Sequence, residues 1–253
     1  LTPLFELIGR PEVIKGLWSQ GEGKFKETLS LFSEIGIDKC GKYLEILTDN
    51  KVIGHVHISQ DFARAPYSIA RVLQFLNNKE LEIDDLYHII PRLKRAIGEK
   101  SFERGLPSWS LYYFLVTIKK IKTIRVDKFV SIVLMLKEVI GQEHVGKAYA
   151  QGYLWFVEAM EVFSQIGIKK SSALIEDFKN LSNLHYFTVA FAHNPRSFAR
   201  YIMEKSKFPV KETPIIFNEK TITGDKIIVL LGELLGRSFK EEEYLFLAPS
   251  ELI

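Results

Sequence analysis

The chain contains an internal repeat, and this repeat constrains the fold more than any other feature of the sequence. Residues 21–39 (GEGKFKETLSLFSEIGIDK) recur 131 positions later as residues 152–170 (GYLWFVEAMEVFSQIGIKK). The two copies share the ending F-S-x-I-G-I-x-K, and Phe25 in the first copy matches Phe156 in the second. Self-similarity at a fixed offset indicates that one small structural unit is repeated along the chain.

Three kinds of marker recur at a shorter spacing of about 43 residues. Helices are expected to begin near residues 22, 66, 108, 152 and 195. A break with a β-branched residue and charges follows each of them, at residues 36–39, 82–85, 125–128, 167–170 and 209–212. The helices after the breaks mostly end at an Ile-Gly or Leu-Gly step, as at Ile53-Gly54 and Ile140-Gly141. A shared period of this length is typical of helical-repeat proteins.

Local sequence chemistry favours helices in these units. Pro66 suits the first position of a helix, because proline lacks a backbone N–H and the N–H at that position forms no hydrogen bond within the helix. A glycine after the last apolar residue is the usual position of a left-handed C-cap. The residues between two main helices, such as 142–151, have room for a third short helix. Trp18, Trp109 and Trp155 are expected to pack between units as large apolar anchors.

The period and the helix pattern resemble the HEAT and armadillo classes of α-solenoid across almost the whole chain. The resemblance implies a stack of helical units used for binding, with two helices per unit in the HEAT class and three in the armadillo class. We therefore predict an all-α fold in which residues 1–253 form one helical-repeat domain of five to six units. The units are expected at residues 1–36, 37–80, 81–123, 124–166, 167–209 and 210–253, with a short irregular or β insertion at 211–225. Neither end shows a polar capping repeat, so a piece of a longer chain is expected.

Composition excludes several classes of protein. Hydrophobic residues make up 47% of the chain and charged residues 26%, as in an ordinary soluble protein. The single cysteine, Cys40, excludes an internal disulfide and a cysteine-based zinc site, and it fits a reducing cytosol. No apolar run approaches the roughly 20 residues needed to cross a bilayer, so a cytoplasmic protein without a membrane partner is predicted. The abundance of Lys, Glu and Ile is typical of a thermophile.

No catalytic or cofactor motif is present in a complete form. A glycine pair with phosphate-loop spacing is followed by Glu22, where that loop requires lysine. On an extended segment His55 and His57 would face one metal ion with Asp61 nearby, but a surface position just past a helix end is the simpler interpretation. We therefore predict a non-enzymatic protein with no cofactor, no metal and no catalytic residue.

The basic residues are the most suggestive feature for function. Between positions 92 and 128 there are ten Lys or Arg and three Asp or Glu, mixed with Trp109, Tyr112 and Tyr113. Stacked units would bring cations near helix ends into a ridge that follows a phosphate backbone. The candidate nucleic-acid-binding residues are Arg92, Lys94, Arg95, Lys119, Lys120, Lys122, Arg125, Lys128, Lys169 and Lys170. The structural alternative is that lysines in the last turn of a helix complement the helix dipole.

Arg196 and Arg200 form a second candidate, an anion-binding pair near the start of a helix. Arg71 is the repeat counterpart of Arg200, because residues 62–71 match residues 191–200 at six of ten positions. This correspondence favours a structural role in which such arginines join neighbouring units.

Three functions from different classes are consistent with these features. The first is a non-enzymatic interaction module or scaffold that binds a protein or peptide segment, as the sensor or interaction domain of a larger multidomain protein. The second is a nucleic-acid-binding solenoid that uses the basic ridge of residues 92–128. The third is an enzyme on a helical-repeat scaffold, such as a base-repair glycosylase, which needs an acidic residue that faces a basic cleft.

Overall fold

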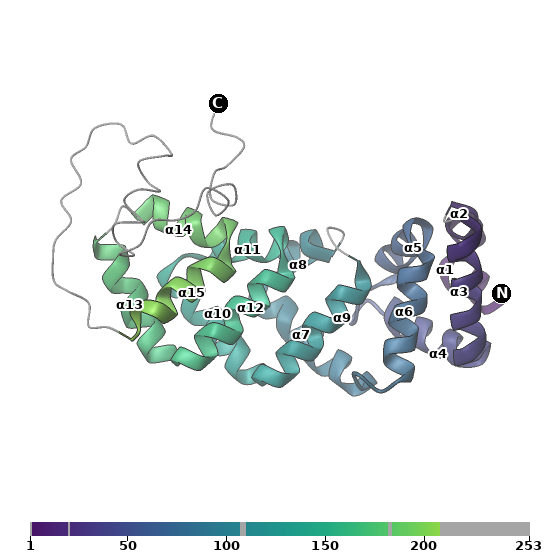
Figure 1. Ribbon diagram of the computed structural model, residues 1–253, viewed down its shortest axis with the longest axis horizontal. Coiled ribbons are helices and arrows are strands. Elements are labelled where there is room, and N and C mark those ends of the chain that lie inside the picture. Colours follow the sequence, from purple (N-terminus) through teal and green to yellow (C-terminus); the bar gives the residue numbers. More distant parts are fainter. Residues whose placement is uncertain (1, 20, 107–109, 182–183, 208–253) are drawn as a thin grey trace, which may run out of the picture. The chain divides into compact units, whose positions relative to one another are not determined.

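A computed structural model describes residues 2–19, 21–106, 110–181 and 184–207 of the chain. These residues contain fifteen helices and no strand, which confirms the predicted all-α class (Figure 1). In chain order the helices are α1 (Thr2–Ile8), α2 (Arg10–Ser19), α3 (Gly21–Ile35), α4 (Ile37–Thr48), α5 (His55–Arg64), α6 (Pro66–Asn77), α7 (Ile83–Ile97), α8 (Glu99–Gly105), α9 (Leu111–Ile124), α10 (Val126–Val139), α11 (Gln142–Gln151), α12 (Tyr153–Ile166), α13 (Ile168–Leu181), α14 (Leu184–His193) and α15 (Pro195–Lys205). The expected insertion at 211–225 and the last expected unit, 210–253, lie outside the described residues.

Short helices recur at every third position in this order. Helices α2, α5, α8, α11 and α14 span seven to ten residues. They begin at residues 10, 55, 99, 142 and 184, so successive starts are 42 to 45 residues apart. The short helix predicted at residues 142–151 is α11, with the same bounds.

The packing of the helices divides the chain into two compact units. Unit 1 contains Leu1–Val130 and Tyr149–Val157. Unit 2 contains Ser131–Ala148 and, among the described residues, 158–207. The division falls inside helices α10, α11 and α12: the first turns of α10 and α12 and the last three residues of α11 belong to unit 1.

Consecutive helices are often joined by one residue with a positive φ. Gly98 ends α7 and precedes α8 with φ +99° and ψ +131°. Glycine adopts this backbone without steric cost, whereas a residue with a Cβ rarely does. The predicted glycine at helix ends is confirmed at Gly98 and Gly141, which both have a positive φ. Gly54 also has a positive φ, but α4 ends at Thr48 and Gly54 instead precedes α5, so the helix end predicted at Ile53–Gly54 is wrong.

Arg125 occupies a junction of this kind although it is not a glycine. It joins α9 to α10 with φ +76° and ψ +123°. The sequence aligns it with Gly36 and Gly167, whose φ values are +91° and +94°. A side chain in such a backbone region costs about 1–3 kcal/mol. The junction before α10 is therefore strained relative to its glycine counterparts.

Aromatic rings form the centre of unit 1. Phe102 of α8 stacks on Tyr149 with ring centroids 6.0 Å apart, and it meets Phe114 of α9 edge-on at 5.7 Å. Tyr153 packs edge-on against Phe114 at 5.8 Å, and its hydroxyl donates a hydrogen bond to the Ser110 carbonyl at 3.1 Å. All four rings are at most 1% exposed. Burial of each such side chain contributes about 1.5–3 kcal/mol to stability.

Phe198 of α15 has the equivalent central place in unit 2. Its ring contacts Phe187 and Phe191 of α14, at centroid distances of 4.7 and 5.3 Å. The ring centroid of Phe163 of α12 lies 6.5 Å from that of Phe198. This aromatic cluster holds α14 and α15 together and gives unit 2 a core of its own.

The expectation that the tryptophans pack between units is wrong for two of them. Trp18 is 84% exposed on α2, and Trp155 is 36% exposed on α12. Helix α2 packs on α5 through Gly16 and Leu17, so Trp18 lies beyond the buried face. Trp109 lies outside the described residues.

Replacement of Arg125 by glycine should stabilise the protein. Arg125→Gly removes the backbone strain at the α9–α10 junction, so we expect the free energy of unfolding to rise by about 1 kcal/mol. Urea unfolding followed by circular dichroism measures the change.

Gly36→Ala is the matched control for that variant. A Cβ at Gly36 would meet no atom within 4 Å, so any change reports the backbone alone. We expect Gly36→Ala to lower stability by about 1 kcal/mol or more. A loss of stability in Arg125→Gly would contradict the assignment of strain to this junction.

Gly16→Ala should destabilise the contact between α2 and α5. The added Cβ would lie 2.3 Å from the Phe62 carbonyl oxygen, which is backbone and cannot rotate away. Overpacking of this kind costs about 1–3 kcal/mol. Gly23→Ala, in the interior of α3 with no atom within 4 Å of the new Cβ, should instead stabilise by up to about 1 kcal/mol. Equal thermal midpoints for the two variants would show that the packing does not require Gly16.

Candidate functional site

Three of the candidate basic residues are already paired with carboxylates. Arg92 of α7 forms an ion pair with Asp127 of α10, and this interaction lowers the pKa of the Asp127 carboxyl. On α9, Lys119 pairs with Glu80 and Lys122 pairs with Asp85, the latter at 2.6 Å. These pairs join elements 35 to 39 residues apart in the chain. Their charge is compensated inside the protein, which weakens the attraction of this region for phosphate.

Two further candidates donate to backbone carbonyl groups. Lys94 Nζ donates to the Asn50 carbonyl at 2.8 Å and lies 5.3 Å from the centroid of the Phe102 ring. Arg95 Nε donates to the Pro91 carbonyl, one turn earlier on α7, at 3.3 Å. Lys94 thus joins α7 to the turn after α4.

The remaining candidates lie at different places in the fold. Lys120 of α9 is half-buried, whereas Arg125 and Lys128, at the junction and in the first turn of α10, are exposed. Lys169 and Lys170 are exposed in the first turn of α13, in unit 2. A cation in the first turn of a helix opposes the helix dipole, so the dipole does not explain these two lysines.

The predicted anion-binding pair has one compensated member. Arg196 Nε lies 3.0 Å from Glu158 Oε2 of α12, so this ion pair joins α12 to α15 within unit 2. Arg200, one turn later, is exposed. The two members of the pair therefore differ, since Arg196 has a carboxylate partner in the protein and Arg200 lies at the surface.

A different set of side chains comes together on helices α3, α6 and α9 of unit 1. Helix α3 packs against α6, and α6 packs against α9 (Figure 1). Lys24 Nζ of α3 lies 4.0 Å from the centroid of the Tyr67 ring on α6. Arg71, one turn after Tyr67, lies with Cζ 4.9 Å from the centroid of the Tyr112 ring on α9. We call Lys24, Tyr67, Arg71, Tyr112 and the adjacent Tyr113 the α3–α6–α9 face.

Hydrogen bonds fix the arginine of this face. Arg71 Nη2 donates to the Tyr112 hydroxyl at 3.4 Å. The nearby hydroxyls of Tyr67 and Tyr112, that of Tyr67 first, raise the pKa of Arg71. Lys24 donates to Glu27 at 2.7 Å, and this hydrogen bond raises the pKa of Lys24. Arg71 therefore differs from Lys24, because tyrosines rather than a carboxylate hold it.

The rings of the face are packed but not covered. Tyr112 meets Phe75 edge-on at 5.9 Å and Tyr113 at 5.7 Å between centroids. Tyr67 and Tyr112 are half-buried, whereas Tyr113 is 48% exposed. From the sequence, Arg71 was identified only as the counterpart of Arg200. The i, i+4 spacing of Tyr67 and Arg71 within a predicted helix was the available signal, because it places the two residues on the same side of that helix.

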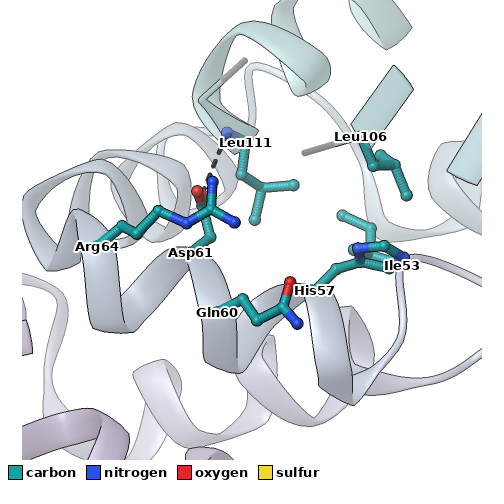
Figure 2. A pocket seen from close by; sticks show the side chains of 7 residues that line it. All are labelled: Ile53, His57, Gln60, Asp61, Arg64, Leu106 and Leu111. Carbon is teal, nitrogen blue, oxygen red and sulfur yellow. Dashed lines mark hydrogen bonds between the residues drawn. The ribbon is translucent and has the colours of Figure 1, made fainter. Parts of the chain in front are cut away.

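A small pocket lies between α5 and the ends of α8 and α9 (Figure 2). Its lining residues are Ile53, His57, Gln60, Asp61, Arg64, Leu106 and Leu111. Asp61 accepts a hydrogen bond from the Leu111 backbone N–H at 3.3 Å, so it caps the start of α9. Burial raises the pKa of the Asp61 carboxyl, although this hydrogen bond and the charge of Arg64 act in the opposite direction. The pocket has room for about one water molecule.

Two kinds of reactive group were sought in the described part of the chain: metal ligands and a nucleophilic thiol. In the described residues, no three His, Cys, Asp or Glu side chains gather closely enough to hold a metal ion. The extended segment on which His55 and His57 would share a metal ion is instead the first turn of α5, where two residues apart point in different directions. Cys40 is buried in α4, and burial raises the pKa of its thiol to about 11. The thiolate that acts as a nucleophile is therefore scarce at neutral pH.

Comparison of the chain with protein-family models, with curated proteins and with solved structures found no match. Among the helices of the described part of the chain, none combines the length and apolar character needed to cross a membrane.

The buried carboxyl group of Asp61 should make stability depend on pH. Because the pKa of Asp61 is higher in the folded protein, the protonated carboxyl group stabilises the folded state. This stabilisation is fully present below the ordinary pKa of about 4, and it is lost as the pH rises through the raised pKa. Asp61→Asn keeps an oxygen for the Leu111 N–H and does not ionise. We therefore expect its stability relative to the unsubstituted protein to increase between about pH 4 and neutrality.

Asp127→Asn is the control with the opposite sign. The pKa of Asp127 is lowered by Arg92, so its contribution is present at neutral pH and is lost as the pH falls through the lowered value. Urea midpoints relative to the unsubstituted protein should therefore rise with pH above about pH 4 for Asp61→Asn, and fall with rising pH below about pH 4 for Asp127→Asn. Parallel curves would show that burial does not govern the ionisation of Asp61.

Proposed function

We propose that this protein is a non-enzymatic interaction module, built from three-helix repeats with a period near 43 residues, that binds an extended protein segment along the α3–α6–α9 face. The observation that carries the proposal is a row of cations and tyrosines, from Lys24 through Arg71 to Tyr113, that crosses the packed helices α3, α6 and α9.

The recurring helix order supports the repeat. A short helix returns every third position, and single positive-φ residues join the helices at equivalent places. Contacts between equivalent helices also recur at one period. Ser68 bonds Ser110 at a separation of 42 residues, Arg71 bonds Tyr112 at 41, and Tyr153 bonds Ser110 at 43. A stack in which each unit packs on the next produces this pattern of contacts.

The spacing of the helices suits an extended ligand. Packed helices lie about 8–10 Å apart, and an extended chain rises about 3.3 Å per residue. An extended segment that crosses α3, α6 and α9 would therefore meet a new helix roughly every third residue. Tyrosine and arginine, which the face presents, are the residue types most often found at the energetic centres of protein interfaces.

Nucleic acid is the second candidate partner. The mixture of cations and rings on the α3–α6–α9 face favours it, because single strands bind through phosphate contacts and base stacking. The carboxylate partners of Arg92, Lys119 and Lys122 weigh against it in the region 92–128. The enzyme hypothesis receives less support, since Asp61 faces a pocket with room for about one water molecule rather than a base.

A peptide selection tests the proposed function. Peptides are selected from a random library on the purified protein, synthesised, and measured by calorimetry. We expect selected peptides to lose about tenfold or more in affinity on Tyr113→Ala, because this removes the half-exposed ring at the α9 end of the proposed interface.

Val56→Ala provides the matched control. Val56 is 62% exposed on α5, outside the α3–α6–α9 face, so its truncation should leave affinity unchanged. Selected peptides that bind both variants equally well would place the interaction elsewhere. Oligonucleotides that bind more tightly than any peptide, with affinity falling steeply as salt rises, would replace this proposal by the nucleic-acid function.

A further inference from the structure

We infer that Arg71 is the centre of an anion-binding site that takes a carboxylate side chain of the bound segment, so that the partner is an acidic protein segment with an apolar or aromatic residue beside the acidic one. This inference rests on the proposed function and names the chemistry of its partner.

The first reason is that the guanidinium of Arg71 is held in place before any ligand binds. It lies against the ring of Tyr112 of α9, and the hydroxyl of the same residue accepts a hydrogen bond from it. An arginine side chain normally loses much rotational freedom when it binds a ligand. Here two helices have already imposed that order, so less affinity is lost on binding.

The second reason is that the charge of Arg71 has no carboxylate partner within the described residues. Its partner there is Tyr112, through the ring and the hydroxyl. Arg92 and Arg196, in contrast, each pair with a carboxylate. Lys24, the other cation of the face, pairs with Glu27 at 2.7 Å. Arg71 is therefore the cation of the face whose charge is left for an anionic ligand.

The third reason is that donors remain for a ligand. A guanidinium has five N–H donors in a planar fork, and the Tyr112 hydroxyl accepts from one of them, so several remain for a ligand. The fork matches the two oxygens of a carboxylate, which form paired, charge-assisted hydrogen bonds.

The surroundings favour a carboxylate of a protein over the phosphates of a nucleic acid. Lys24 and Arg71 already lie over the rings of Tyr67 and Tyr112, where bases would need to stack. Two carboxylates flank the face, because Glu27 pairs with Lys24 and Glu80 pairs with Lys119. A backbone with a charge on every nucleotide would meet these carboxylates, whereas a peptide with isolated acidic residues would not.

Tyr113 completes the site on the side of α9. Its ring is 48% exposed and lies next to Tyr112 at 5.7 Å between centroids. A residue adjacent to the bound acid would contact this ring, and an apolar or aromatic side chain would gain most from doing so.

Fluorescence anisotropy with three labelled probes tests the inference. The probes are a peptide that repeats glutamate-alanine-tyrosine, the same peptide with glutamine in place of glutamate, and an oligothymidylate. We expect the acidic peptide to bind at low ionic strength about tenfold more tightly than its glutamine counterpart, since charge-assisted hydrogen bonds are lost in the latter. The oligothymidylate should bind more weakly than the acidic peptide.

Variants of the site identify the arginine. Arg71→Gln should abolish the preference for the acidic peptide, and Arg71→Lys should lose most of it, because lysine keeps the charge but not the fork. Arg200→Gln, at the exposed repeat counterpart in unit 2, should bind like the unsubstituted protein. Tyr112→Phe, which keeps the ring and removes one hydroxyl, should reduce the preference a few-fold and serves if Arg71→Gln does not fold.

Several results would overturn the inference. These are equal binding of the two peptides, no binding of either, an acidic preference that survives Arg71→Gln, and Arg71-dependent binding of oligothymidylate in preference to peptide. If library-selected peptides still require Tyr113 while acidic residues are not enriched among them, the proposed function stands and the carboxylate site does not. If selected peptides ignore the face altogether, both fail.

Discussion

A single residue with positive φ between consecutive helices is the constraint on which the arrangement depends. At Gly36, Gly98 and Gly167 one helix ends and the next begins without an intervening loop, so there is little chain over which the angle between them can vary. Glycine makes this conformation inexpensive, and Arg125 occupies the same place under strain. The junctions recur along the chain, and within unit 1 α3 packs on α6 and α6 packs on α9.

The α3–α6–α9 face follows from that packing. Tyr67 and Arg71 are one turn apart on α6, so they share a side of the helix, and the packing of α9 brings Tyr112 over the guanidinium. Lys24 reaches the same row from α3. Elsewhere in unit 1, Arg92 pairs with Asp127 and Lys122 pairs with Asp85, and these ion pairs join one helix to another. Where tyrosines hold the cation, the charge remains available to a partner. This difference separates Arg71 from most of the basic residues that the sequence singled out.

The sequence predicted the helices better than their contacts. Helix ends were visible because they depend on local chemistry: glycine at Gly98 and Gly141 permits a positive φ, and α11 has the bounds expected from the spacing of its neighbours. Side-chain pairing could not be predicted, because Arg92 meets Asp127 across 35 residues and the choice of partner depends on how α7 and α10 pack. Trp18 shows a related limit, since its size indicates burial but only the position of α5 decides which face of α2 is covered. The pair His55 and His57 required an extended segment that is in fact helical.

The central claim is that the chain is built from three-helix repeats. The unfolding of a protein that lacks one repeat tests this claim most directly. Deletion of residues 83–125 removes α7, α8, α9 and the junction at Arg125, and it joins Glu82 to Val126, which aligns with Ile83. The account predicts a helical protein that unfolds cooperatively in urea, because each unit packs mainly on its neighbours. Deletion of residues 83–104, about half of this length, should give no cooperative unfolding, since α9 would then follow α6 out of register. A disordered product from the first deletion, or equally cooperative unfolding of both, would contradict the repeat.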